Sequence, residues 1–136
     1  MSGGVKRASE QEVSTHAPRS HRDLKVWQIS LDLTETLYRV TADWPKHEQF
    51  GLISQVRRAA VSVPANIAEG AGRRTAGEFM HFVGVARGSL AELETLLAVA
   101  RRLDYIEEPV FRSLSEDLFE LGRMTTGLLR TLEERR

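Results

Sequence analysis

The sequence predicts an all-α protein built as an antiparallel, up-down-up-down four-helix bundle. From Leu24 onward, apolar residues recur at intervals of three and four in four separate stretches, each long enough for an amphipathic helix. No stretch alternates between apolar and polar residues for long, as a half-buried strand would. The connections between the four stretches are short, and short connections make consecutive helices antiparallel.

The first predicted helix runs from about Asp23 to Asp43. Asp23 is of a residue type that caps helix N-termini, and Pro45 disfavours helical geometry at Trp44, which would end the helix. The apolar residues form two neighbouring stripes, a width that predicts contacts on two sides. One stripe is Val26, Ile29, Leu33, Leu37 and Val40, and the other is Leu24, Trp27, Leu31 and Tyr38.

The second predicted helix runs from about Glu48 to Gly70 and carries Pro64 in its interior. Because proline has no N–H, the carbonyl of Ala60 loses its partner within the helix, and we expect a kink there rather than an end. The apolar seam of this helix is Ile53, Val56, Ala60, Val63 and Ile67.

The third predicted helix, from Thr75 to about Leu103, opens with a capping box, in which Thr75 and Glu78 each satisfy a free backbone N–H. The fourth runs from about Glu108 to Glu133, with Pro109 in the first turn, where proline is favourable. The seam of the third helix is Phe79, Val83, Ala86, Leu90, Leu93, Leu97 and Ala100, and that of the fourth is Phe111, Leu114, Leu118, Leu121, Leu128 and Leu132.

The composition is that of one globular domain, since 41% of the 136 residues are apolar and 28% are charged. Residues 1–21 are polar and aperiodic, and we expect a disordered N-terminal tail followed by a bundle domain over residues 22–136. The absence of cysteine excludes disulfides, thiolate zinc sites and a cysteine nucleophile. Without a signal peptide or an apolar run of about 18 residues, we expect a cytoplasmic protein with no membrane partner.

The charges balance overall but not locally. Nineteen basic and nineteen acidic residues remove the strongly basic signature of many nucleic-acid binders. Between Gly51 and Gly77, however, four arginines accompany a single acid, Glu69, and arginine binds phosphate through two parallel hydrogen bonds. These arginines are candidate nucleic-acid contacts: Arg57, Arg58, Arg73 and Arg74. In the alternative interpretation, Arg73 pairs with Glu69 and the others pair with the acidic fourth helix or a second subunit.

Gly84 and Gly88 belong to a strip of small residues along one flank of the third helix. A glycine inside a helix costs roughly 1 kcal/mol relative to alanine, and close approach of another backbone would offset that cost. The strip is therefore predicted to pack closely against the alanine-rich flank of the second helix or against a neighbouring subunit. The alternative is that both are tolerated surface glycines.

A second group of residues predicts a structural polar network. Asn66 and Glu92 fall on or beside apolar seams, where a polar side chain needs partners, and Glu69 and Ser89 lie near them in the helical register. We expect Arg57 or Arg58 to reach Glu92 or Glu69 and fix the helix register. An active site is the sharper interpretation, but no nucleophile–base pair accompanies these carboxylates.

Metal and nucleotide motifs are incomplete. Glu78 and His81 form half of the Glu-x-x-His signature of di-iron bundles, and the sequence has no second copy. No glycine-rich phosphate loop is present either. We therefore expect no metal and no cofactor.

Three runs of residues resemble a known family. They are DLKVWQ at 23–28, QVRRAAVSVPANIAEG at 55–70, and the stretch from EFMHF at 78–82 to GSLAELE at 88–94. The chain resembles the bacterial four-helix bundle family named for open reading frames within intervening sequences of 23S ribosomal RNA genes. The positions that match the family are Arg57, Arg58, Ser62, Pro64, Asn66, Glu69, Gly70, Gly88, Ser89 and Glu92.

The resemblance implies a homopentamer of antiparallel bundles around a central channel. It also implies a shape like that of the accessory variability determinant of diversity-generating retroelements, a pentameric bundle that binds nucleic acid and a reverse transcriptase. The family has no established enzymatic activity. Such an oligomer would explain the wide apolar faces and the glycine strip.

Together these observations predict a non-enzymatic, homo-oligomeric bundle that acts as a binding or scaffold module. RNA or another nucleic acid is the candidate ligand, and the four arginines would contact its phosphates. The alternative is a protein-interaction adaptor without nucleic-acid binding, which would hold a partner protein through its acidic fourth helix or its tail.

Overall fold

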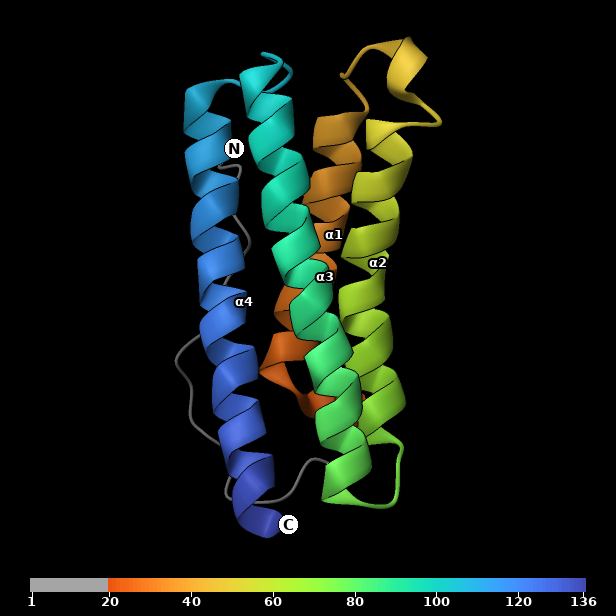
Figure 1. The fold of residues 1–136 in the computed structure, drawn as a ribbon, viewed down its shortest axis with the longest axis vertical. Helices are drawn as coiled ribbons and strands as arrows, with labels where there is room; N and C mark the ends of the chain where they lie inside the picture. Colours follow the sequence, from red (N-terminus) through yellow and green to blue (C-terminus); the bar gives the residue numbers. More distant parts are fainter. Residues whose placement is uncertain (1–19) are drawn as a thin grey trace.

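The computed structural model describes residues 20–136, and this part of the chain folds into four long α-helices with no strand. They are α1 (Lys25–Thr41), α2 (Leu52–Ala71), α3 (Ala76–Arg102) and α4 (Glu108–Arg135). Two short 3-10 helices, η1 (His21–Asp23) and η2 (Lys46–Glu48), precede α1 and α2. The predicted all-α class with four helices is confirmed. Figure 1 shows the helices side by side, with consecutive helices joined at alternating ends of the molecule.

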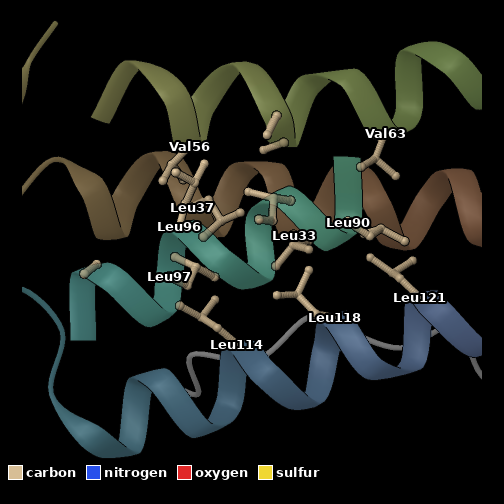
Figure 2. Close-up of a cluster of buried hydrophobic side chains, with 14 of the residues drawn as sticks. Leu33, Leu37, Val56, Val63, Leu90, Leu96, Leu97, Leu114, Leu118 and Leu121 are labelled. Carbon is tan, nitrogen blue, oxygen red and sulfur yellow. The ribbon is translucent and has the colours of Figure 1, made fainter. Parts of the chain in front are cut away.

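Leucine, isoleucine, valine and alanine from all four helices fill a single core. In Figure 2, side chains from the four helices point toward one another, among them Leu33, Val56, Leu97 and Leu121. Leu37, Leu93 and Leu114 are completely buried. The buried positions follow the predicted seams, because a spacing of three and four keeps a residue on one face of a helix.

The beginning of α1 differs from the prediction. The N-cap is Leu24, whose side chain makes no capping hydrogen bond, and Asp23 belongs to η1 instead. The predicted tail lies outside the described residues up to position 19. Its last two residues are described: Ser20 caps η1, and the ring of His21 lies 4.7 Å from the ring of Trp27.

The helix ends at Thr41, two residues before the predicted end. The N–H of Trp44 donates to the carbonyl of Thr41 at 3.1 Å, which closes the helix with a tight turn. Trp44 itself is 4% exposed and packs against Tyr105, with ring centroids 5.7 Å apart. The chain therefore turns early and places an indole in the end of the core.

Helix α2 begins at Leu52 rather than at Glu48, because Lys46–Glu48 form η2. The carboxylate of Glu48 accepts a hydrogen bond from the N–H of Leu52 at 3.1 Å. Glu48 thus caps α2 from outside the helix, by satisfying one of the N–H groups that a helix start leaves free.

Pro64 lies within α2, and the helix continues through it to Ala71, as predicted. The hydroxyl of Thr34, on α1, lies 3.2 Å from the carbonyl of Ala60, the group that the missing proline N–H leaves without a partner. The same hydroxyl lies 2.8 Å from the carbonyl of Ser30. A neighbouring helix therefore supplies a donor where α2 lacks one.

The turn between α2 and α3 is held by a cap and by a close contact. Thr75 accepts a hydrogen bond from the N–H of Glu78 at 3.1 Å, which confirms the threonine half of the predicted capping box. A Cβ added to Gly70 would lie 2.8 Å from Cδ1 of Phe79 and 2.9 Å from Cβ of Phe82. Gly70 is therefore where the backbones of α2 and α3 approach closely.

Helix α3 ends at Arg102, and Asp104 then adopts a positive φ of 65°. The N–H of Tyr105 donates to the carbonyl of Ala100 at 2.9 Å, which satisfies one of the last carbonyls of α3. Pro109 follows in the first turn of α4, as predicted. Within residues 20–136, no helix is long and apolar enough to cross a membrane.

Candidate nucleic-acid interface

The structure separates the four predicted arginines into two pairs. Arg57 and Arg58 lie near the beginning of α2, whereas Arg73 and Arg74 follow its end. Arg73 is fifteen positions after Arg58, which corresponds to roughly 22 Å along a helix at 1.5 Å per residue. The four side chains therefore do not form one phosphate-binding patch.

Arg57 joins α2 to the end of α1. Its Nε donates to the hydroxyl of Thr41 at 2.9 Å, and its Nη2 donates to the carbonyl of Tyr38 at 3.1 Å. The guanidinium also lies 4.5 Å from the centre of the Tyr38 ring. These contacts satisfy a carbonyl in the last turn of α1 and place a positive charge at its C-terminus, where the helix dipole favours a cation.

Arg73 forms the ion pair of the alternative interpretation. Its Nη2 lies 2.6 Å from a carboxylate oxygen of Glu69, and its guanidinium lies 4.8 Å from the centre of the Phe82 ring. Arg58 and Arg74 are exposed, and neither has an ion-pair partner among the described residues. Only these two of the four arginines are therefore free to contact an anion without breaking an existing interaction.

The polar network between α2 and α3 consists of Ser62, Asn66 and Ser89. Ser89 donates to the hydroxyl oxygen of Ser62 at 2.8 Å, and the Asn66 amide donates to the carbonyl and hydroxyl oxygens of Ser62 at 2.8 and 3.0 Å. All three side chains are half-buried. The network links the two helices and supports a structural role for Asn66 and Ser89.

Glu69 and Glu92 do not join this network. Glu92 is exposed, since its side chain lies about 60° around α3 from Ser89, farther from the buried seam of that helix. Glu69 is exposed as well and is paired with Arg73. The expected link from Arg57 to either carboxylate is also replaced, since Arg57 contacts α1 instead.

Gly84 and Gly88 are exposed and have open space around them. A Cβ added at either position would meet nothing within 4 Å, so α2 does not pack closely against them. Val85 and Val99, on the same helix, are each 41% exposed. Among the described residues, the glycines and the valines form an uncovered outer face of α3.

A groove between α3 and α4 gathers a different set of arginines, which the sequence analysis did not single out. It has a volume of about 610 Å³ and contains Arg87 from α3 and Arg123 and Arg130 from α4. Figure 1 shows these two helices side by side along most of their length. The other lining residues are Leu90, Ala91, Glu94, Leu118, Phe119, Gly122, Thr126 and Gly127.

The charge of this α3–α4 groove is positive. Arg87 and Arg130 are exposed, and within residues 20–136 they have no ion-pair partner. Arg123 lies 3.4 Å from Glu120, which is outside the lining, and Glu94 is the one acid that lines the groove. The ring of Phe119 is 70% exposed, one helical turn before Arg123. The groove therefore combines unpaired guanidinium groups with an accessible aromatic ring.

The spacing of residues in the sequence indicates the α4 side of this groove but not the α3 side. Arg123 and Arg130 are seven residues apart, which places them on one face of a helix, and Phe119 lies off the apolar seam of α4. Arg87, however, is on another helix, and its approach to the same groove depends on the rotation of α3 against α4. Only the packed structure fixes that rotation.

The loops at one end of the bundle hold two groups with shifted pKa values. The hydroxyl of Tyr105 donates to the carboxylate of Glu48 at 2.8 Å. Hydrogen bonds from the Leu52 N–H and then from Tyr105 lower the pKa of Glu48, and the bond to Glu48 raises the pKa of Tyr105. Both side chains are occupied in joining the α1–α2 connection to the α3–α4 connection, which is a structural role.

The incomplete metal motif is not completed by the fold. His81 is exposed, and its ring lies 5.1 Å from that of Phe82. Among residues 20–136, no three histidine, aspartate or glutamate side chains are grouped where they would hold a metal ion.

Comparison with known proteins identifies similar chains. The family model described as 23S rRNA-intervening sequence protein matches residues 22–127. A crystal structure from Bacteroides thetaiotaomicron, described as a protein of unknown function from the S23 ribosomal protein family, superposes with a TM-score of 0.69 at 21% identity. The similarity covers 76% of this chain and 97% of that one, and it supports the fold. Comparison with curated proteins gives no match.

Proposed function

The chain belongs to the 23S rRNA-intervening sequence protein family, and we propose that it is a non-enzymatic scaffold that binds RNA in the α3–α4 groove. The observation that carries this proposal is the convergence of Arg87, Arg123 and Arg130 from two helices on one hollow surface. Two of these arginines have no ion-pair partner among the described residues, so an anion does not have to compete with an internal carboxylate.

Phosphate is the anion that suits these side chains. A guanidinium donates two parallel hydrogen bonds to phosphate oxygens, and a concave surface concentrates the positive potential of several arginines. The chain as a whole is neutral, so a local groove, rather than a global charge, must attract the nucleic acid. In this proposal the groove arginines, rather than Arg57 and Arg73, are the principal contacts, because those two already bind other residues of the chain.

The scaffold is a homo-oligomer in this proposal, with five subunits as the family resemblance implies. The support is the uncovered outer face of α3, where Gly84 and Gly88 leave room for another backbone and Val85 and Val99 are exposed. Exposed apolar residues next to small ones are typical of a surface that another copy covers. Repeating the groove in every subunit would also strengthen RNA binding through multivalency.

The experiment compares two double variants of equal charge change. Arg87→Ala with Arg130→Ala removes the unpaired groove arginines, and Arg58→Ala with Arg74→Ala removes two exposed arginines elsewhere. RNA binding by the unchanged protein should weaken as salt rises, with a logarithmic slope of about −0.7 for each phosphate neutralised on a single strand. The groove variant should bind at least tenfold more weakly at low salt, and its salt slope should be shallower.

The control variant should retain the affinity and slope of the unchanged protein. A larger loss in the Arg58/Arg74 variant would move the site back to those arginines, equal losses in both variants would refute a site confined to the groove, and no RNA binding at low salt would refute the proposal. Circular dichroism spectra of both variants should match that of the unchanged protein, since all four side chains are exposed.

A protein-interaction adaptor is the second candidate function. Phe50 is 90% exposed and Leu103 is 50% exposed, in the two connections that Tyr105 and Glu48 join. These apolar side chains would suit a partner protein at that end of the bundle. Affinity purification from native cells that yields a stoichiometric protein but no RNA would favour this candidate.

A further inference from the structure

The exposed ring of Phe119 lies outside the hydrophobic core of the described residues. Its neighbours on the core side of α4, Leu118 and Leu121, are buried, whereas Phe119 is 70% exposed at the α3–α4 groove. No other aromatic side chain lines this groove. A large planar ring beside arginines offers a face on which a nucleic-acid base stacks, and such stacking tolerates any base.

We propose that the α3–α4 groove takes single-stranded RNA, with one base stacked on Phe119 and the phosphates held by Arg87, Arg123 and Arg130. This inference rests on the proposed RNA-binding function and specifies its ligand. A duplex keeps its bases paired and stacked inside, so they cannot reach the ring, whereas an unpaired strand presents both its bases and its phosphates.

The spacing of the arginines selects a ligand with repeated negative charge. Arg123 and Arg130 are seven residues apart, or roughly 10 Å along α4 at 1.5 Å per residue. A single phosphate would have to draw the two side chains together to contact both, whereas a chain of phosphates can contact both in extended conformations at once. Arg87 meets the same chain from the opposite wall.

The lining also argues against an acidic helix from a protein partner. A docked amphipathic helix needs apolar pockets for several anchor side chains. Here the apolar residues Leu90 and Leu118 are already buried, each 6% exposed. Apart from Phe119 and the charged side chains, the rest of the lining is Ala91, Gly122, Thr126 and Gly127. One ring and a polar, small-residue surface fit a single base better than a row of apolar anchors.

Two polar side chains give the groove a means of distinguishing RNA from DNA. Glu94 and Thr126 line it together with the arginines. A carboxylate repels phosphates, but it accepts a hydrogen bond from the 2′-hydroxyl of ribose, which deoxyribose lacks. The phosphates and base faces are common to both nucleic acids, so this hydroxyl is the one feature on which discrimination depends.

The test uses the full chain and three probes of one sequence: a short unstructured RNA, the same sequence as single-stranded DNA, and the RNA paired with its complement. Phe119→Leu keeps an apolar side chain but removes the stacking face, and it should weaken single-stranded RNA binding about tenfold. Duplex binding should be the same before and after the substitution. The single-stranded DNA should bind the unchanged protein more weakly than the RNA does.

Phe119→Trp supplies a second, independent measurement. The larger ring should keep the affinity, and a base stacked on the indole should quench its fluorescence when single-stranded RNA is added. The unchanged protein, which has Trp27 and Trp44 outside the groove, gives the background signal in the same titration.

Several results would overturn the inference. Unchanged single-stranded RNA affinity in Phe119→Leu would remove the stacking role while leaving the proposed RNA function intact, provided the groove arginine variant still binds weakly. Equal binding of single-stranded DNA would refute recognition of the 2′-hydroxyl. Displacement of RNA by polyglutamate at equal charge concentration, with no effect of Phe119→Leu, would point to an acidic protein instead.

Discussion

At the scale of single residues, the bond between Tyr105 and Glu48 makes stability depend on pH. The pKa of Glu48 is lowered from 4.5, so its stabilising contribution is present above that pH and is lost as the pH falls through the lower value. The pKa of Tyr105 is raised from 10.0, so its contribution is present below pH 10 and is lost as the pH rises through the higher value. The melting temperature should therefore decline at both ends of this range.

Tyr105→Phe tests that assignment, because it removes the hydroxyl and keeps the ring against Trp44. The variant should melt at a lower temperature than the unchanged protein between pH 5 and 9. The difference should shrink in alkaline solution, where the unchanged protein also loses the bond. A constant difference at every pH would contradict a contribution from this ionisable pair.

Gly70 should tolerate substitution less well than any exposed glycine. A Cβ at this position would lie 2.8 Å from the Phe79 ring and 3.2 Å from the Phe79 carbonyl, so the ring and the backbone must both move. Gly70→Ala should lower the free energy of unfolding by about 1–3 kcal/mol, as overpacking does. Urea denaturation measures this change.

Gly127→Ala is the matched control, because a Cβ there meets nothing within 4 Å in the middle of α4. It should raise the free energy of unfolding by up to about 1 kcal/mol through helix propensity. Equal effects of the two substitutions would show that the contact between Gly70 and α3 does not constrain the fold.

The residue types indicated which side chains need hydrogen-bond partners, but not which residues those partners are. Asn66 was expected in a network because it lies beside an apolar seam, and it binds Ser62 at the α2–α3 contact. The partner of Arg57 was not predictable, since Thr41 and Tyr38 belong to another helix whose rotation the sequence leaves open. Contacts between helices depend on that rotation, whereas contacts within a helix depend on spacing alone.

At the scale of elements, α1 stabilises the proline position of α2. Thr34→Val removes the hydroxyl near the Ala60 carbonyl while keeping the shape of the side chain, and it should cost about 0.5–1.5 kcal/mol. Pro64→Ala restores an N–H that can donate to the same carbonyl. In the Pro64→Ala background, Thr34→Val should therefore cost less than it does alone.

A double-mutant cycle, with each variant unfolded in urea, isolates this coupling from other effects of the two substitutions. The coupling should exceed about 0.3–0.5 kcal/mol, which is the deviation from additivity that independent sites show. Strictly additive changes would mean that Thr34 acts only through its bond to Ser30 on its own helix.

The four helices could be predicted from sequence because their apolar periodicity is long, and their ends could not be predicted equally well. Helices α1 and α2 start later in the sequence than predicted, because a short 3-10 helix precedes each one. The carboxylate of Glu48 caps α2 from four residues before its first residue, Leu52. This local arrangement has no periodic pattern in the sequence. The start of α3 was predicted closely, since Thr75 and Glu78 form a recognisable capping signal.

At the scale of the whole molecule, a single sequence does not separate apolar faces that cover the core from those that another molecule covers. The wide apolar face of the first helix was expected to have contacts on two sides. Leu31 and Tyr38, in the second stripe, are more than one-third exposed in the described part of the chain. Val85 and Val99, on α3, are likewise 41% exposed. The outer face of α3 and the α3–α4 groove could therefore be recognised only in the folded chain.

The outer face of α3 is the surface on which we expect another copy of the chain to pack. Because the space around Gly88 is open within the protomer, Gly88→Leu should leave the fold intact but obstruct the close approach of another copy. Light scattering should show an oligomer, of five chains in the proposed function, for the unchanged protein and a smaller species for this variant. Gly127→Leu makes the same chemical change at an open position of α4 and should leave the mass unchanged. A single-chain mass for the unchanged protein would remove the oligomer from the proposed function. An unchanged mass in Gly88→Leu would place the interface on another face, such as the one that carries Leu31 and Tyr38.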